Sequence, residues 1–287
     1  MRILLAIDGS EESYQATKAL TQLSRPEQTL LLHVLAVPKP AYPMMMPEIA
    51  QELYTTMERH MREEGERLLH RTALSLPMPA GQVSRHLEVG KPAQLILSVA
   101  QEQRVDLIVL GARGLGPIRE RLFGSVSHRV LNEAPCPILV VNRALTPLRD
   151  LLLCLEGPHD AEAMLRFLST KPFQSSPEIT VLTIVPFSRP AWPADERSAE
   201  IIQGQLLLSA NDFVEGVAEK LSAAGYSTTA RAQLGIPSTT ILDEVASRRP
   251  DLLVMGSHGR KGMTRVVLGS ASHAILHRMP CPVLVIR

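Results

Sequence analysis

The chain has 287 residues, enough for about two domains of ~100–200 residues each. Apolar residues make up 45% of it and charged residues 21%, which excludes a disordered or collagen-like chain. Lysine and arginine number 30 against 29 aspartates and glutamates, and this balance argues against nucleic acid as the main partner, since such proteins usually carry a basic excess.

Short apolar runs alternate with longer amphipathic stretches along the first half of the chain. The runs are rich in Leu, Ile and Val without polar alternation, which is typical of strands buried on both faces of a parallel sheet. The predicted strands are Ile3–Ile7, Leu30–Val37, Val83–Val89, Leu107–Leu110 and Ile138–Val141. The predicted helices are Glu11–Ser24, Pro47–Ser75, Pro92–Gln103 and Ser125–Glu133. Five strands alternating with four helices indicate a doubly wound α/β domain.

The second half of the chain repeats the first. Asp106–Gly111 recurs as Asp251–Gly256, 145 residues later, and the proline-flanked last strand recurs with the same offset. A repeat of this length is a duplicated domain rather than a solenoid unit. We therefore predict two tandem doubly wound domains, residues 1–143 and 149–287, each with a five-stranded parallel sheet and four helices.

Each half carries a glycine pattern that suits a phosphate group. A glycine ends a buried strand, a second follows three positions later, and after nine more residues a Gly-Ser pair opens a helix. Glycine lets the backbone approach a ligand closely, and a helix N-terminus offers unpaired N–H groups. The alternative is that the glycines only make tight turns and the serine is an ordinary N-cap; the duplicated spacing favours phosphate. The residues of the two patterns are Gly111, Gly114, Gly124, Ser125, Gly256, Gly259, Gly269 and Ser270.

Three other sequence signatures accompany the glycine pattern. The first strand ends in Ile-Asp-Gly-Ser, the second strand reads Leu-Leu-His-Val, and the last strand reads Pro-Cys-Pro-Val-Leu-Val. Together they resemble the universal stress protein family, over essentially the whole chain as a tandem pair. The resemblance implies the strand order 3-2-1-4-5 and, as in ATP-binding members, a nucleotide held where strands 1 and 4 part. It implies that Asp8 and the backbone around Val34 contact the adenosine part. The residues it implies for ribose and phosphates are Gly111, Gly114, Gly124, Ser125 and Val126.

The second half offers a matching but altered set of candidates. Its candidates are Gly256, His258, Gly259, Gly269, Ser270 and Ala271. In the first half Arg113 stands at the place of His258 and is cationic at neutral pH. The first strand of the second half ends in Glu156-Gly-Pro158 where the first half has Asp8-Gly-Ser10. Because proline lacks both the hydroxyl and the N–H of serine, we expect the second site to be weaker or empty.

Other polar and sulfur-containing residues have two interpretations each. His128 and His273 occupy the same place in the two last helices, where they either contact a phosphate or lie on a polar helix face. Cys136 and Cys281 are expected to pack as small hydrophobic side chains rather than to react. No Cys and His cluster has zinc-ligand spacing and no nucleophile signature occurs, so neither a metal site nor a catalytic residue is predicted.

The leading interpretation is a stress-response or regulatory protein that binds ATP or a related adenine nucleotide, with or without Mg²⁺, and has little or no turnover. One alternative is a slow ATPase or nucleotide-dependent transferase, and another is an interaction module that has lost its ligand. We also predict that the halves pair through Ile138–Val141 and Val283–Ile286, because bare apolar edge strands invite aggregation. Further homo-oligomers are left open.

The sequence also bears on the compartment. No apolar run approaches the ~20 residues that span a bilayer, and the run Ile3–Ile7 is too short for a signal peptide. Three cysteines without framework spacing argue against a secreted disulfide scaffold. We therefore expect a cytoplasmic protein with reduced thiols and no membrane partner.

Overall fold

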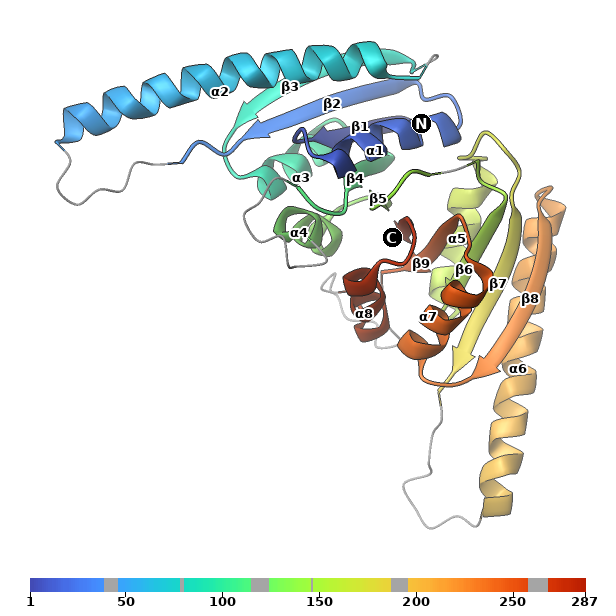
Figure 1. The fold of residues 1–287 in the computed structure, drawn as a ribbon. Helices are drawn as coiled ribbons and strands as arrows, with labels where there is room; N and C mark the ends of the chain where they lie inside the picture. The colour runs from blue at the N-terminus through green and yellow to red at the C-terminus, as the bar shows by residue number, and fades with distance from the viewer. Residues whose placement is uncertain (39–45, 78–79, 115–123, 146, 187–195, 258–267) are drawn as a thin grey trace.

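The computed structural model describes the chain except for residues 39–45, 78–79, 115–123, 146, 187–195 and 258–267. Within the described residues, ten strands form one sheet in the order β3-β2-β1-β4-β5-β10-β9-β6-β7-β8 (Figure 1). The strands are β1 (Arg2–Ile7), β2 (Gln28–Leu35), β3 (Gln82–Val89), β4 (Leu107–Gly111), β5 (Ile138–Val141), β6 (Asp150–Leu155), β7 (Glu178–Val185), β8 (Ser227–Leu234), β9 (Leu252–Gly256) and β10 (Val283–Ile286). The helices are α1 (Glu11–Ala19), α2 (Pro47–Ser75), α3 (Pro92–Glu102), α4 (Ser125–Glu133), α5 (Pro158–Ser169), α6 (Glu196–Ala223), α7 (Pro237–Arg248) and α8 (Ser270–Arg278).

Each half has the predicted doubly wound topology. The first five strands lie side by side in the order β3-β2-β1-β4-β5 and are all parallel. The second half repeats this order as β8-β7-β6-β9-β10. The prediction of two tandem α/β units with the order 3-2-1-4-5 is therefore confirmed.

The first helix is shorter than its apolar pattern suggests. It ends at Ala19 and continues as a 3-10 turn over Leu20–Gln22, instead of running to Ser24. The reason lies in the other half of the chain: Leu23 forms an isolated antiparallel bridge with Phe173, and the Ser24 amide donates to the Pro172 carbonyl at 2.8 Å. These contacts take up backbone groups that a longer helix would have used.

The two sheets join through their fifth strands, as predicted. β10 runs antiparallel to β5, with Leu284 opposite Leu139 and Val283 opposite Val140. In each half the fifth strand would otherwise be an apolar edge with unpaired backbone groups. The pairing removes both edges at once and makes one continuous sheet of the two halves.

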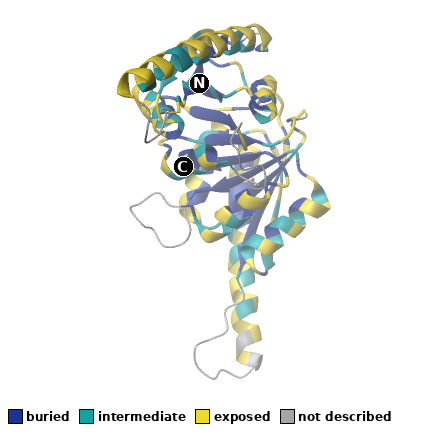
Figure 2. Cartoon of the chain, turned by 60° about the vertical axis from the view of Figure 1, so that its left-hand side comes forward, coloured by how far each residue is buried: buried dark blue, intermediate teal, exposed yellow. Residues whose placement is uncertain are grey.

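Two hydrophobic layers run across this junction. Helices α1, α2, α5 and α6 cover one face of the sheet, and α3, α4, α7 and α8 cover the other. Leu139 and Leu284 belong to the first layer, whereas Val140 and Val283 belong to the second, because successive side chains of a strand point to opposite faces. Figure 2 shows the sheet buried between helices whose outer faces are exposed.

The cysteines pack in the core, as the sequence predicts. Cys136 and Cys281 are 7% and 1% exposed. Burial raises the pKa of the Cys136 thiol to about 12 and that of the Cys281 thiol to about 11. Both thiols are therefore protonated at neutral pH, and the reactive thiolate is scarce.

As for the membrane, none of the helices in the described part of the chain combines the length and the apolar character that a bilayer span requires.

We expect Leu284→Ala to lower the free energy of unfolding by about 2–5 kcal/mol, because the substitution leaves a cavity where β10 meets β5. Leu284 is 1% exposed, whereas Leu208 on α6 is 66% exposed and offers the matched control. Urea unfolding followed by circular dichroism measures both variants. Leu208→Ala should stay within about 0.5 kcal/mol of the parent chain. An equally small effect of Leu284→Ala would contradict the central position of this strand pair.

Candidate functional site

The candidate site of the first half lies where β1 and β4 end side by side. Leu4 pairs with Ile108 and Ala6 with Leu110, so the loops after the two strands leave the same edge of the sheet. After β1 the chain enters α1 on one face, and after β4 it leads to α4 on the other. A crevice at such a switch point is where open α/β sheets bind ligands.

Asp8 is held in place by its own loop. Its Oδ1 accepts hydrogen bonds from the Ser10 amide at 3.0 Å and from the Ser10 hydroxyl at 2.6 Å. The Ser10 hydroxyl oxygen in turn accepts from the Ser13 amide at 3.2 Å and caps α1. Gly9 between them has φ +83°, a conformation that side chains with a Cβ rarely adopt. The Asp-Gly-Ser signature therefore fixes one carboxylate at the end of β1.

Gly114 makes room for this carboxylate. A Cβ at Gly114 would collide with Oδ2 of Asp8. Asp8 and Gly114, which are more than 100 residues apart in sequence, therefore lie next to each other. The absence of a side chain at Gly114 therefore leaves space for the Asp8 carboxylate.

Gly111 has a packing role. A Cβ there would lie 2.8 Å from the carbonyl carbon of Glu12 and 2.9 Å from the amide nitrogen of Ser13. The glycine thus allows the start of α1 to pack on the end of β4. For this position the packing interpretation has a direct structural cause, and a contact with ribose or phosphate stays a prediction.

The start of α4 lacks a side-chain cap among the described residues. Gly124 is its N-cap, no described side chain caps the helix, and Ser125 in its first turn is exposed. The Gly124 amide donates to the Ala112 carbonyl at 2.9 Å, which ties the helix to the strand it follows. An uncapped helix start presents N–H groups and a partial positive charge to solvent. Val126 in the same turn is half-buried against the core.

Sequence reasoning missed a serine that anchors this helix start. The Ser127 hydroxyl donates to the Gly111 carbonyl at 2.8 Å, and the equivalent Ser272 donates to the Gly256 carbonyl at 3.2 Å. Both serines are buried. The duplicated Gly-Ser-x-Ser could have revealed them, because a second serine two positions on has no role in the N-cap interpretation.

Two further candidates of the first half are engaged within the protein. Arg113 forms an ion pair with Glu12, with Nε and Oε1 3.1 Å apart, and its side chain is 44% exposed. Val34 is half-buried near the end of β2. Its neighbour His33 places Nδ1 2.8 Å from the Ile7 carbonyl oxygen, which explains the histidine of the Leu-Leu-His-Val signature as a link between β2 and β1.

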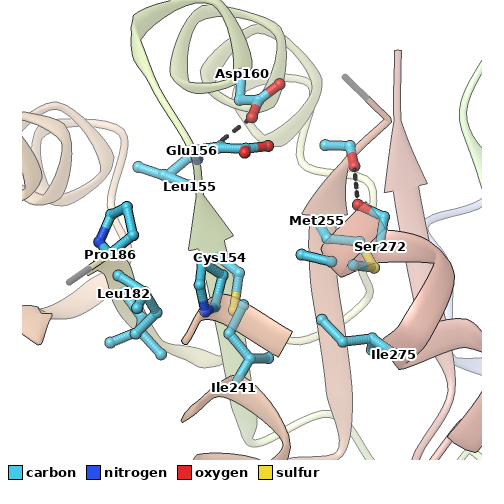
Figure 3. A pocket seen from close by; sticks show the side chains of 14 residues that line it. Cys154, Leu155, Glu156, Asp160, Leu182, Pro186, Ile241, Met255, Ser272 and Ile275 are labelled. Atoms are coloured by element: carbon cyan, nitrogen blue, oxygen red, sulfur yellow. Dashed lines mark hydrogen bonds between the residues drawn. The ribbon is translucent and has the colours of Figure 1, made fainter. Parts of the chain in front are cut away.

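In the second half the same place in the fold is a cavity of about 120 Å³ (Figure 3). The predicted candidates Gly256 and Ala271 line it, together with Glu156 from the end of β6. Most of the wall is apolar and comes from β6, β7, β9, α7 and α8. The apolar side chains that Figure 3 labels are Cys154, Leu155, Leu182, Pro186, Ile241, Met255 and Ile275.

Asp160 is a buried acid in this cavity that the sequence did not single out. It lies in the first turn of α5, is 7% exposed, and its Oδ2 accepts a hydrogen bond from the Glu156 amide at 3.3 Å. A Cβ at Gly256 would collide with its carboxylate. Burial raises the pKa of Asp160 to about 6, and the Glu156 carboxylate adds to this rise, while the amide of Glu156 and His159 act in the opposite direction.

The remaining candidates of the second half fall into two groups. Gly269 and Ser270 begin α8, which no described side chain caps, and Ser270 is exposed as Ser125 is. His258 and Gly259 lie outside the described residues, so their predicted part in phosphate binding stays a prediction.

The family model of the Universal stress protein family matches residues 1–142 and again residues 147–287. The chain belongs to the universal stress protein family. It is 32% identical to Universal stress protein YxiE of Bacillus subtilis over 144 residues, which cover 49% of this chain and 97% of that protein. It is 25% identical over 300 residues to a universal stress protein of Mycolicibacterium smegmatis, with 99% of this chain and 96% of that protein covered.

A solved structure shares this fold. The crystal structure of a universal stress protein from Archaeoglobus fulgidus superposes with a TM-score of 0.65 over 99% of this chain and 95% of that chain. The sequence identity is 18%, so this likeness shows the fold alone. The tandem arrangement is thus shared with a relative of similar length.

We expect Asp160→Asn to stabilise the chain at pH 7.5 by about 1–3 kcal/mol, because the parent chain buries a charged carboxylate there. In the folded parent chain the pKa of Asp160 is about 6, whereas an unfolded aspartate has a pKa of 3.8. Between these two values the folded chain binds a proton that the unfolded chain does not. The advantage of the variant should therefore shrink as pH falls from about 6 towards 4. Urea unfolding at several pH values measures it. A pH-independent difference would show that the carboxylate is not desolvated.

Proposed function

We propose that the N-terminal half binds ATP or a related adenine nucleotide, and that the chain acts as a nucleotide-dependent regulator in stress response with little or no turnover. The observation that carries this proposal is the meeting of Asp8, Gly114 and the uncapped start of α4 at one switch point. Some members of the universal stress protein family bind ATP, which supports the same ligand class here.

The residues of the first half fit a nucleotide in three respects. The Asp8 carboxylate, fixed by Ser10, can accept hydrogen bonds from a sugar hydroxyl or an amino group. The α4 N-terminus offers backbone donors to phosphate oxygens. Arg113 is 44% exposed beside Glu12 and can supply a cation to a phosphate by turning from its ion pair. Mg²⁺, where it accompanies the nucleotide, would be held mainly through the phosphates themselves.

The second half supports a weaker version of the same site. Its cavity has apolar walls that suit a flat ring, but it holds two carboxylates, Glu156 and Asp160, close to its polar end. Glu156 stands at the place of Asp8, and Pro158 offers neither the hydroxyl nor the N–H with which Ser10 fixes Asp8 in the first half. We therefore propose that the two halves differ in affinity and that the first one binds more tightly.

Replacing Gly124 tests the first site directly. We expect Gly124→Val to lower ATP affinity at least about tenfold, because a Cβ at this position would already lie 3.2 Å from the Ala112 carbonyl oxygen and the branched side chain would crowd the helix start. Calorimetry measures the affinity, and thermal unfolding checks that the variant is folded. Gly204→Val is the matched control, since a Cβ there meets nothing within 4 Å. If Gly124→Val binds ATP as tightly as the parent chain, the site is misplaced.

The same samples separate a binder from an enzyme. Incubation of the parent chain with ATP and Mg²⁺, followed by analysis of the nucleotides, should return ATP essentially unchanged over hours. Stoichiometric ADP that disappears in Gly124→Val would instead establish the slow ATPase.

The inequality of the halves has its own test. We expect calorimetry to give a tight phase and a weak phase, or one equivalent of ATP at moderate concentration. One or two hydrogen bonds of ~0.5–1.5 kcal/mol each correspond to a difference of about two- to more than a hundredfold. Asp8→Ala should remove the tight phase, whereas Glu156→Ala should leave it intact. Two equal tight sites, with both substitutions equally harmful, would refute the inequality while leaving nucleotide binding standing.

A further inference from the structure

Three histidine rings from the two halves meet at the junction of the molecule. His128 comes from α4, and His273 and His277 come from α8. The ring centroids of His128 and His273 are 5.5 Å apart, those of His128 and His277 are 6.4 Å apart, and those of His273 and His277 are 4.4 Å apart. His128 and His273 are equivalent positions of the repeat, and the proposed nucleotide site uses neither of them.

The histidines lie where the two halves hold each other beyond the strand pair. The Asn142 amide donates to the Met279 carbonyl at the end of α8, and the Arg287 guanidinium donates to the Leu131 carbonyl in the last turn of α4. Between these contacts, the Leu268 amide lies 3.5 Å from Oδ1 of Asn132. A change in the fit of α4 against α8 would therefore change the junction of the halves.

The surroundings of His128 favour its neutral form. The ring is half-buried, and burial, followed by the charges of His273 and His277, lowers the pKa of His128. The Asn132 amide nitrogen lies 3.3 Å from Nδ1, which can accept from it only when that nitrogen is unprotonated. His273 and His277 are exposed, so protons reach the cluster from solvent.

The other described charged groups on the facing elements are three arginines and one glutamate. On α4 these are Arg129 and Glu133, which pair with each other at 3.0 Å, and near its end Arg287; on α8 it is Arg278. The segments 115–123 and 258–267, outside the described residues, carry one glutamate, five lysines and arginines and one further histidine, His258, in sequence. Among the described residues no group of three or more His, Cys, Asp or Glu could hold a metal ion.

We propose that His128, His273 and His277 form a proton-sensitive contact between the two halves, which is closed while the rings are neutral and loosens when they take up protons. The rings of His128 and His273 are arranged edge to face, with 87° between their planes, and the His277 ring is tilted against both. Two or three imidazolium rings at the same distances repel one another across the junction. Histidine is the side chain that ordinarily gains a proton and a positive charge in mild acid.

The direction of the effect follows from proton linkage. Separated, solvent-exposed histidines bind protons below about pH 6.5, whereas His128 in the closed cluster binds its proton less readily. The open arrangement therefore binds more protons as pH falls, and mild acid favours it. Above neutral pH the rings are neutral in both arrangements, and the contact gains nothing from a further rise.

Hydrogen exchange in the full chain tests this local opening. We expect amides of α4 and α8 to lose protection between pH 7.5 and 5.5 by about threefold or more, after correction for intrinsic exchange, relative to those of α3 and α7 on the same face. The variant with His128→Gln, His273→Gln and His277→Gln should lose most of this selective change. His60→Gln, at an exposed position of α2, is the matched control and should keep it. Asp160, whose protonation acts in the opposite direction on stability, is common to all three chains.

A second measurement does not depend on the triple variant folding. Proton NMR of the histidine rings in the parent chain should show His128 titrating at lower pH than His60, and His277→Gln should move the His128 midpoint upward. The proposal is overturned if α4 and α8 show no selective loss of protection in the parent chain, or if the triple variant keeps the full loss. It is also overturned if the titration midpoint of His128 is the same in the parent chain and in His277→Gln.

Discussion

The antiparallel pairing of β5 with β10 is the interaction on which the rest of the structure depends. A doubly wound domain covers the faces of its sheet with helices but leaves its outer strands as edges. Here the fifth strands, Ile138–Val141 and Val283–Ile286, are apolar on both faces, and each removes the other's edge. Because both strands are tethered in one chain, the pair forms at a high effective concentration and does not need a second chain.

This pairing also decides what lies at the centre of the molecule. Helices α4 and α8 flank the fifth strands, so the two glycine-led helix starts and the histidines that follow them are brought to the junction. The adenosine ends of the predicted sites, near β2 and β7, lie further out along the sheet. Duplication thus gives the chain two predicted sites and, between the helix starts predicted to bind phosphate, a histidine contact that neither half has alone.

The two halves show how one backbone accommodates different chemistry. At the end of β1, Asp8 is satisfied by Ser10, and Glu12 pairs with Arg113. At the equivalent end of β6 a proline replaces the serine, and Asp160 turns inward to accept the Glu156 amide. The result is a cavity with a desolvated carboxylate where the first half has a fixed, half-buried one. Such a change affects stability, since burial raises the pKa of Asp160.

The sequence by itself determined the fold class, the duplication, the strand order through the family resemblance, and the pairing of the fifth strands. These follow from local patterns: unbroken apolar runs, helical periodicity, and a repeat with fixed spacing. It also placed the Asp-Gly-Ser turn and the Gly-Ser helix starts at one edge of the sheet, because parallel strands end on the same side. Only the tertiary structure decided which partner each residue has. Gly111 contacts the start of α1, Asp160 lies against Gly256, and His128 meets His273 and His277. These contacts join segments far apart in the chain, and their distances depend on how whole helices pack, which no local pattern encodes.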